Sequence, residues 1–336
     1  EFSVDQKSQV MTIKSAKDLV KYYMTKDIPS YMHGPPGVGK SSVYRQIAAE
    51  ESIGFIDIRL GTKLPEDLSG IPVPDLEKRL AVWLESEFWP NVDRDGEKGI
   101  IVFDELSDAP RSIQSAAYGI ILDRHHLPPG WYPAAAGNRR EDRAAAQTLS
   151  TALANRFAHI DVEPDGESFI EWCNENDIHP FIPAFIHWQP KYVYTMEGSD
   201  GRSFCTPRSW EQVSKVCNAP QGIRFKLIRG LIGEGPAGEF EAYLRITGLP
   251  ELEDVLANPG KCPIPDEPGT KYALSSMLSR HSKRSNFDKI MAYIKRPEFG
   301  RDFEICAVLD ATKRDASLTE TKAFTEFAMR NKDLHL

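Results

Sequence analysis

The chain has 336 residues, of which 41% are hydrophobic and 27% charged, a balance typical of a soluble globular protein. A chain of this length usually forms two or three domains, each with its own hydrophobic core. The net charge of −8 argues against a protein whose main activity is sequence-independent binding to nucleic acid.

Other bulk features bear on location. No stretch approaches the roughly twenty apolar residues needed to span a bilayer, and the N-terminus carries no secretory pattern. The five cysteines are odd in number and lack the close pairing of zinc or redox motifs. A reducing, cytoplasmic location is therefore expected.

The first predicted elements surround a glycine-rich segment. Apolar residues at helical spacing predict a helix over residues 15–24 with Ser15 as its cap. A short apolar run over residues 28–33 predicts a strand, and residues 42–50, without Gly or Pro, predict the helix after the glycine segment. Strand, glycine loop and helix is the order that a phosphate-binding loop requires.

The glycine segment itself fits the pattern of two glycines bracketing four residues, followed by Lys and Ser. Its glycines let the backbone curl so that N–H groups point inward at anionic oxygens, and the helix N-terminus adds partial positive charge. Lys40 is expected to reach the β- and γ-phosphates, and Ser41 to hold Mg²⁺. The predicted nucleotide-binding residues are Gly34, Pro35, Pro36, Gly37, Val38, Gly39, Lys40, Ser41 and Ser42.

An alternating pattern over residues 54–60 predicts the next strand. A Pro/Gly-punctuated stretch then leads to an apolar run at residues 79–84, and together residues 64–84 predict an inserted hairpin. Trp83 and Trp89 have two open interpretations, contact with another protein or packing in a core.

A run of apolar residues ending in two acids is the second informative segment. Residues 99–106 predict a strand buried on both faces of a parallel sheet, because the apolar residues do not alternate. Asp104 and Glu105 then lie where ligands bind in open α/β sheets. We expect Asp104 to hold the Mg²⁺ shell through water and Glu105 to polarise the attacking water. The alternative is an acid that caps the next helix.

Alternation continues to residue 162. Residues 112–122 and 144–154 predict helices, and residues 132–138 and 157–162 predict strands. The pattern predicts a doubly wound α/β domain with a parallel sheet over residues 1–162.

Two residues of this stretch are further site candidates. Asn138, at the end of its strand, is expected to reach the γ-phosphate and the attacking water, with a simple turn as the alternative. Arg156 is expected to leave its own subunit and stabilise charge on a neighbour's γ-phosphate. A cation placed favourably at a helix C-terminus is the alternative for Arg156.

Composition changes after residue 162. Short helices predicted at residues 168–175, 181–187, 209–216 and 223–232 form a smaller helical domain over residues 163–247. Arg208, at the start of the third helix, is expected to contact the phosphates of the same subunit from this lid, with an exposed surface arginine as the alternative. Residues 258–260 and 263–269 predict a linker. Residues 248–336 form a C-terminal extension, helical from about residue 272, whose role stays open.

The C-terminal extension is locally basic. A solvated helical face is one interpretation of this charge, and binding to nucleic acid or an acidic partner is the other. The basic residues are Lys271, Arg280, Lys283, Arg284, Lys289, Lys295 and Arg296.

Five motifs, in order, resemble those of AAA+ ATPases, and specifically of the MoxR branch: GPPGVGKS, GIIVFDEL, AAAGN, LANRF and TPRSW. The resemblance covers about residues 13–247. It implies that residues 34–42 are Walker A, that Asp104 and Glu105 are Walker B, and that Asn138 is sensor 1. It further implies that Arg156 is the arginine finger and Arg208 is sensor 2.

The same resemblance carries functional expectations. Residues 64–84 resemble the helix-2 insert of this clade, a hairpin that faces a central pore. Members hydrolyse ATP with Mg²⁺ and form hexameric rings. They typically act with a partner that carries a von Willebrand factor A domain, and together the two remodel, activate or insert metal into client proteins.

Some alternatives stay open. Arg139, Arg140 and Arg143 crowd the segment after Asn138, and any of them could share the arginine-finger role. The protein could also be a nucleic-acid-associated NTPase, a metal-chelatase motor subunit, or a scaffold that binds nucleotide without hydrolysis. The presence of both Asp104 and Glu105 argues against the scaffold, because a binding-only site needs no residue that activates water.

Overall fold

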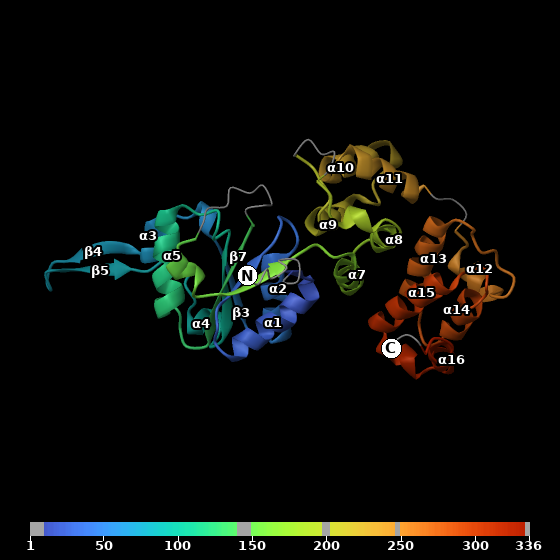
Figure 1. Cartoon of the computed structure of the whole chain (residues 1–336), viewed down its shortest axis with the longest axis horizontal. Helices are drawn as coiled ribbons and strands as arrows, with labels where there is room; N and C mark the ends of the chain where they lie inside the picture. The colour runs from blue at the N-terminus through green and yellow to red at the C-terminus, as the bar shows by residue number, and fades with distance from the viewer. Residues whose placement is uncertain (1–9, 140–148, 197–201, 246–248, 333–336) are drawn as a thin grey trace, which may run out of the picture. The chain divides into compact units, whose positions relative to one another are not determined.

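The computed structural model describes residues 10–139, 149–196, 202–245 and 249–332. The chain forms two compact units, Glu1–Pro164 and Asp165–Leu336, each with hydrophobic clusters of its own (Figure 1). Within the described ranges, none of the helices has the length and apolar character needed to cross a bilayer.

The first unit is built on a six-stranded sheet in the order β1-β8-β2-β7-β6-β3, and every neighbouring pair is parallel. Its strands are β1 (Val10–Met11), β2 (Ser30–His33), β3 (Gly54–Arg59), β6 (Gly99–Asp104), β7 (Trp131–Gly137) and β8 (Ala158–Val162). Because β2, β7 and β6 are neighbours and run in the same direction, the residues that follow them meet at one edge of the sheet.

Helices cover both faces of this sheet, since successive strand residues point to opposite sides. Ile100 and Val102 of β6 pack in a cluster with α1 (Ile13–Thr25) and α2 (Lys40–Glu50). Ile101 and Phe103 pack in a second cluster with α5 (Arg111–Asp123). Shorter helices are η2 (Leu60–Thr62), α3 (Pro65–Ser69), α4 (Val92–Asp95) and α6 (Thr151–Ala154). The predicted doubly wound α/β fold is confirmed.

Two predicted helices of this unit differ from the structure. The first helix begins at Ile13 rather than at a Ser15 cap, because Thr12 caps it and its hydroxyl accepts a hydrogen bond from the Ser15 amide at 3.2 Å. Of the helix predicted over residues 144–154, residues 144–148 lie outside the described ranges. The described part contains only α6, which Ser150 caps.

The apolar run at residues 79–84 pairs as the return strand of a hairpin. Strands β4 (Ile71–Asp75) and β5 (Leu80–Leu84) form a separate antiparallel sheet, with Ile71 opposite Leu84. Figure 1 shows this hairpin projecting away from the six-stranded sheet. Trp83 on β5 is 56% exposed, whereas Trp89 is buried in the cluster beneath α5. Core packing is therefore confirmed for Trp89, whereas contact of Trp83 with another protein stays a prediction.

The second unit is helical in its described parts. Its helices are α7 (Gly166–Glu175), α8 (Phe181–Trp188), η4 (Pro190–Val193), α9 (Pro207–Val216), α10 (Gln221–Ile232), α11 (Glu234–Leu244), α12 (Leu252–Ala257), α13 (Pro268–His281), α14 (Phe287–Ile294), α15 (Arg301–Arg314), η5 (Ala316–Glu320) and α16 (Lys322–Arg330). One hydrophobic cluster centres on Phe185 and Trp210, and another on Leu278 and Phe299. Both lie in one compact unit, and the expected domain division at residues 247/248 stays a prediction.

Two details of this unit correct the sequence interpretation. Helix α11 was not predicted, because Gly235, Pro236 and Gly238 have low helix propensity and lie in its first turns. The predicted linker over residues 263–269 ends earlier, since Pro268 occupies the first position of α13. The segment before α13 is also tied to the core, because the Tyr293 hydroxyl donates a hydrogen bond to the Pro263 carbonyl at 2.6 Å.

Candidate nucleotide-binding site

The glycine segment has the backbone that a phosphate-binding loop requires. Gly37 and Gly39 have φ values of +77° and +103°, in the left-handed region that favours glycine. A Cβ atom on Gly34 would lie 2.7 Å from the carbonyl oxygen of Val162, so no other residue fits there without displacement. Helix α2 begins directly after Gly39, and its N-terminus therefore opens at the loop.

Lys40 is held over this loop by three acceptors. Its ammonium group donates hydrogen bonds to the carbonyl oxygens of Gly34 at 2.7 Å and Pro35 at 2.9 Å, and to Oδ1 of Asn138 at 3.0 Å. The residue is only 8% exposed, and a buried ammonium needs such partners. Phosphate oxygens of a nucleotide would offer stronger, charged acceptors at the same place.

Asn138 connects the loop to the segment that follows β6. Its Nδ2 donates a hydrogen bond to Oδ2 of Asp108 at 3.0 Å, while its Oδ1 accepts from Lys40. The Ser107 hydroxyl donates to the Asn138 backbone carbonyl at 3.2 Å. These bonds fix which way the amide faces. Asp108 and Ser107 were missed in the sequence, although both lie within four residues of Asp104.

The two acids end β6 with a distinctive backbone. The Asp104 carboxylate accepts a hydrogen bond from the Glu105 amide at 2.9 Å. Glu105 has a φ of +60°, a conformation that is uncommon outside glycine and concentrates at functional sites. Its carboxylate lies beside Gly61, where an added Cβ would be 2.9 Å from Oε2. Helix α5 has Pro110 as its N-cap, so neither acid caps that helix.

A third acid, Asp57 on β3, lies near Asp104. Burial and then the Asp104 charge raise the pKa of Asp57 above its ordinary value. One of its oxygens is buried without a hydrogen-bond partner among the described residues, and the other is 3.7 Å from Arg45. Sequence reasoning missed Asp57, because in an alternating strand it reads as a solvent-facing residue.

The carboxylate and hydroxyl oxygens near the phosphate loop show whether a divalent metal fits this site. Hydrated Mg²⁺ is held by one or two carboxylates and by phosphate oxygens, while its waters bond to nearby acceptors. Asp104 at the end of β6, the unpaired oxygen of Asp57, and Ser41 in the first turn of α2 are the matching donor set. The residues present therefore fit a hydrated Mg²⁺.

Arg156 lies on an exposed turn between α6 and β8. The buried side chains of Leu153 and Phe157 anchor this turn on either side. Within the described part of the chain, the Arg156 side chain forms no hydrogen bond or ion pair. It is therefore accessible to a second molecule, as an arginine that acts on a neighbour must be.

The other candidate arginines differ. Arg139 is mostly buried and pairs with Glu163 at 3.5 Å within its own unit, whereas Arg140 and Arg143 lie outside the described residues. Arg208 occupies the first turn of α9 in the second unit, behind the Thr206 cap. A contact between Arg208 and the phosphates stays a prediction.

A histidine pair joins the phosphate loop to the Arg156 turn. His33, the residue before Gly34, lies 2.7 Å from His159 between Nε2 and Nδ1, and Nε2 of His159 is 2.8 Å from the Ala154 carbonyl. A carbonyl only accepts, so Nε2 of His159 donates to it and Nδ1 accepts from His33. Burial and the nearby His159, Lys40 and Arg139 lower the pKa of His33 to about 4. Hydrogen bonds through His33 and His159 thus link the start of the phosphate loop to the turn that carries Arg156.

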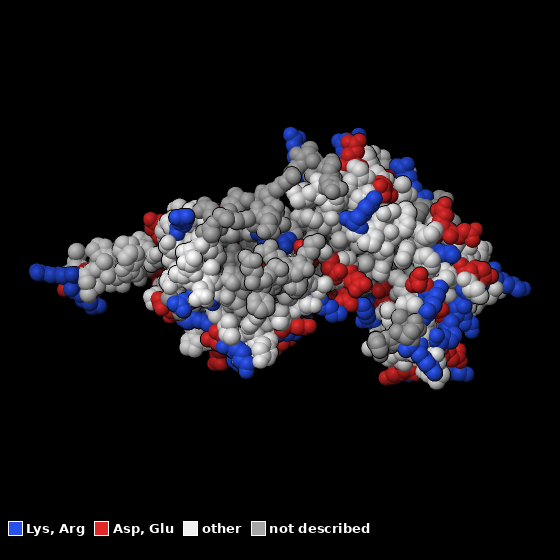
Figure 2. All heavy atoms as spheres, in the orientation of Figure 1, with Lys and Arg blue, Asp and Glu red and all other residues white. Residues whose placement is uncertain are grey.

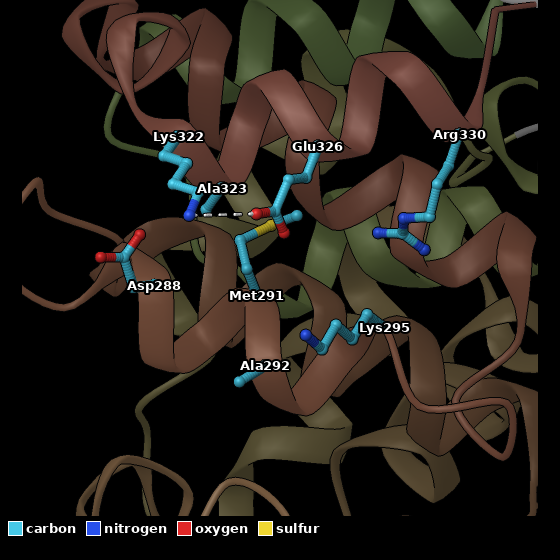
Figure 3. A pocket seen from close by; sticks show the side chains of 8 residues that line it. All are labelled: Asp288, Met291, Ala292, Lys295, Lys322, Ala323, Glu326 and Arg330. Atoms are coloured by element: carbon cyan, nitrogen blue, oxygen red, sulfur yellow. Dashed lines mark ion pairs between the residues drawn. The ribbon is translucent and has the colours of Figure 1, made fainter.

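A cavity elsewhere has no part in this arrangement. It measures about 180 Å³ and lies in the second unit, and Lys322 and Glu326 of α16 pair at 3.9 Å along one side of it (Figure 3). It is lined by Asp288, Met291, Ala292, Lys295, Lys322, Ala323, Glu326 and Arg330. None of the predicted site residues is among them.

Comparison with known proteins defines the class of this site. Residues 30–118 match the model of AAA, the ATPase family associated with various cellular activities. The matched segment contains β2, the phosphate loop, α2, β6 with its acids, and part of α5. The first unit therefore contains a segment similar to the AAA ATPase family, whose members bind nucleotide and typically a divalent metal.

The remaining comparisons add less. A comparison with curated proteins found no match. A similar solved structure is a candidate ATPase from Cytophaga hutchinsonii, 16% identical over 66% of this chain and 77% of that chain, with a TM-score of 0.37. Another is the RuvB Holliday junction branch migration motor of Thermotoga maritima, 16% identical over 85% and 89%, with a TM-score of 0.38.

Proposed function

We propose that this protein is a MoxR-type AAA+ ATPase that hydrolyses ATP between the subunits of a hexameric ring and uses the energy to remodel or activate a client protein. The observation that carries this proposal is the meeting of Lys40, Asn138 and the acids of β6 at one sheet edge. The proposal of a partner with a von Willebrand factor A domain rests on the motif resemblance.

The residues divide the work of hydrolysis between them. The loop amides and Lys40 bind and orient the phosphates, and Asn138 positions the γ-phosphate beside Glu105. Glu105 orients the attacking water and accepts its proton. Mg²⁺, when bound near Ser41 and Asp104, neutralises charge on the phosphate oxygens. Arg156 of a neighbouring subunit completes the site by stabilising charge that grows in the transition state.

The hairpin is the proposed contact surface for the client. It presents several large apolar side chains to solvent, among them Leu76 at 85% exposure and Trp83 at 56%. In Figure 2 the stem shows mainly uncharged atoms, with Lys and Arg at its tip, where Lys78 and Arg79 lie. Exposed apolar groups of this kind mark protein-interaction sites.

Nucleic acid is the less favoured partner. Several cations of the C-terminal extension are already engaged, since Arg284 pairs with Glu320 at 3.1 Å and Lys271 donates to the Glu298 carbonyl at 2.6 Å. Figure 2 shows acidic and basic atoms interspersed on this face of the second unit, with no continuous basic stripe there.

Phosphate release in the presence of Mg²⁺ and ATP tests the enzymatic part. We expect Lys40→Ala to lose nucleotide binding, because the loop then lacks its cation. Glu105→Gln should bind ATP with wild-type affinity and turn it over about 100-fold more slowly or worse. Glu97→Gln, at an exposed position outside the site, is the matched control. Wild-type turnover by Glu105→Gln would refute the assigned role.

The same slow variant tests the client surface. Loaded with ATP and used as bait, Glu105→Gln should retain an engaged protein, and the added substitutions Leu76→Ser and Trp83→Ala should abolish that retention. Unchanged retention by the hairpin variant would show that the client binds elsewhere. Turnover stimulated by DNA or RNA would favour the nucleic-acid alternative.

A further inference from the structure

Three potential metal ligands gather in the second unit, within residues that the nucleotide site does not use. They are His187, Cys306 and Asp310, and their ligating atoms all lie within 4.8 Å of one another. Imidazole, thiol and carboxylate together form a donor set that suits a borderline-soft divalent cation rather than Mg²⁺ or Ca²⁺.

The fold places these residues on two helices that both pack against α13 (Pro268–His281). Cys306 and Asp310 are four residues apart on α15, so their side chains share one face of the helix. His187 lies in the last turn of α8, and its ring stacks on Tyr272 of α13 with centroids 5.7 Å apart and planes 4° apart. The stacking holds the imidazole in place before any ion binds.

The distances leave the histidine without a hydrogen bond. Nε2 of His187 lies 4.0 Å from Oδ2 of Asp310, and Sγ of Cys306 lies 4.0 Å from the same oxygen. A separation of 4.0 Å is too long for an N–H···O hydrogen bond. Nε2 is buried and has no partner among the described residues. A buried nitrogen of this kind in a polar cluster calls for an explanation.

A zinc ion would satisfy all three groups. With zinc–ligand distances of about 2.0 to 2.3 Å, tetrahedral ligands lie about 3.4 to 3.6 Å from one another. The observed separations need only a small inward rotation of the side chains. The buried Nε2 of His187, which has no hydrogen-bond partner among the described residues, offers the nitrogen ligand.

The surrounding charges permit a cation. Asp310 is 8% exposed; burial raises its pKa to about 6, and the charges of Lys313 and Arg314 oppose this rise. The Lys313 ammonium is already paired with Glu171 of α7 at 2.6 Å, which reduces its repulsion of an incoming ion. Deprotonated Cys306 and Asp310 carry two negative charges, which match the charge of a divalent ion.

We propose that His187, Cys306 and Asp310 bind one Zn²⁺ ion that links α8 to α15, with water in the fourth position. Binding displaces the thiol proton of Cys306 to solvent and involves no change in oxidation state. The site is structural, because it joins two helices of the second unit and none of its three ligands is a residue of the nucleotide site. The zinc proposal therefore does not depend on the proposed ATPase activity, and each can be tested without the other.

Metal titration of the full, untagged chain after dialysis against a chelator tests this proposal. We expect one Zn²⁺ per chain to bind with a dissociation constant below about 1 μM and to raise the melting temperature. Co²⁺ should give the intense near-ultraviolet band of thiolate coordination. Cys306→Ala and His187→Phe should each weaken Zn²⁺ binding about 100-fold or more, since loss of even an outer partner costs 10- to 100-fold.

Cys262→Ala, which removes another buried thiol of the same unit, is the matched control and should bind Zn²⁺ like the wild type. Circular dichroism of each variant shows whether it is folded. If Cys306→Ala does not fold, Cys306→Ser with Co²⁺ decides, because the thiolate band must disappear. Wild-type binding weaker than about 100 μM, or a thiolate band that survives loss of Cys306, would overturn the proposal.

Discussion

Asn138 acquires its orientation from two neighbours rather than from its own backbone. An amide group can face either way at little cost. Here the Lys40 ammonium can donate only to the amide oxygen of Asn138, and the Asp108 carboxylate can accept only from its nitrogen. In the proposed ATP hydrolysis, the carboxylate of Asp108 would therefore act through Asn138. A second oxygen of Asp108 is buried without a hydrogen-bond partner in the described part of the chain, which makes this position sensitive to change.

Asp108→Ala tests this dependence. Without the acceptor, the Asn138 amide is free to rotate, and we expect kcat for ATP hydrolysis to fall about tenfold, or about 1.4 kcal/mol in barrier. KM should change little, because the loop and Lys40 still bind the phosphates. Asp93→Ala, at an exposed position on α4, is the control. A variant whose kcat equals that of the wild type would show that the amide is held in some other way.

Gly137 shows how close the packing is around this amide. A Cβ atom there would lie 2.3 Å from the Tyr31 hydroxyl and 2.7 Å from the Ser107 hydroxyl. The glycine before Asn138 is therefore required by its neighbours, and the Gly-Asn pair is more than a turn. Sequence alone left these two interpretations open, because nothing local to residues 137–138 reveals what packs against them.

At the scale of elements, β2 and β8 are coupled through their histidines. In the unfolded chain the pKa of His33 is near 6.5. Burial and nearby positive groups lower this pKa to about 4 in the folded protein. The unfolded chain thus binds more protons than the folded one between pH 4 and 6.5. Stability contributed by this residue is present above that window and is lost as the pH falls through it.

We therefore expect the first unit to lose about 2 kcal/mol of unfolding free energy through His33 between pH 7 and pH 5. Urea unfolding, followed through signals of first-unit residues, measures this loss. His33→Gln retains a donor for His159 but has no titrating group, so its stability should fall less over the same pH range. Parallel pH profiles for the two proteins would contradict the assignment.

Local sequence pattern determines the hairpin, whereas packing in the second unit determines helix α11. Strands β4 and β5 pair with each other, in register from Ile71–Leu84 to Asp75–Leu80, and a Pro/Gly-punctuated stretch followed at once by an apolar run is visible in the sequence. Helix α11 was invisible, since its Gly and Pro residues oppose helix formation locally. Buried Ala237, Phe240 and Tyr243 show that packing in the second unit overrides this preference.

At the scale of the whole molecule, the proposed assembly depends on Arg156. This arginine is exposed, while the Lys40 site that would need it lies in the same unit of a neighbouring copy. Arginine fingers supplied in trans contribute about 10³- to 10⁵-fold to phosphoryl transfer. Activity should therefore depend on association between subunits.

Mixing two inactive variants tests this dependence. Lys40→Ala should lack its own nucleotide site but supply an intact finger, and Arg156→Ala should bind ATP but lack the finger. Each alone should be inactive, and an equal mixture should recover measurable ATP hydrolysis at the mixed interfaces. Specific activity of the wild type should also fall on dilution. Full activity of Arg156→Ala, or constant specific activity down to the monomer, would exclude a finger in trans.

The strongest local patterns of the sequence were enough to predict the phosphate loop, the buried β6 and the doubly wound sheet. Their signals are short in range, since glycine spacing, apolar runs and turn residues each act on their immediate neighbours. The positions of Lys40, Asp104 and Asn138 at one edge also followed, because parallel strands end together.

Tertiary structure decided what lies beside these residues. Asp57 approaches Asp104 because β3 pairs with β6, and Asp108 reaches Asn138 because β6 lies beside β7. His187 meets Cys306 and Asp310 across more than a hundred residues of chain because α8 and α15 both pack against α13. Contacts between residues distant in the chain depend on how hydrophobic faces pack, and a single sequence records only which faces exist, not which of them meet.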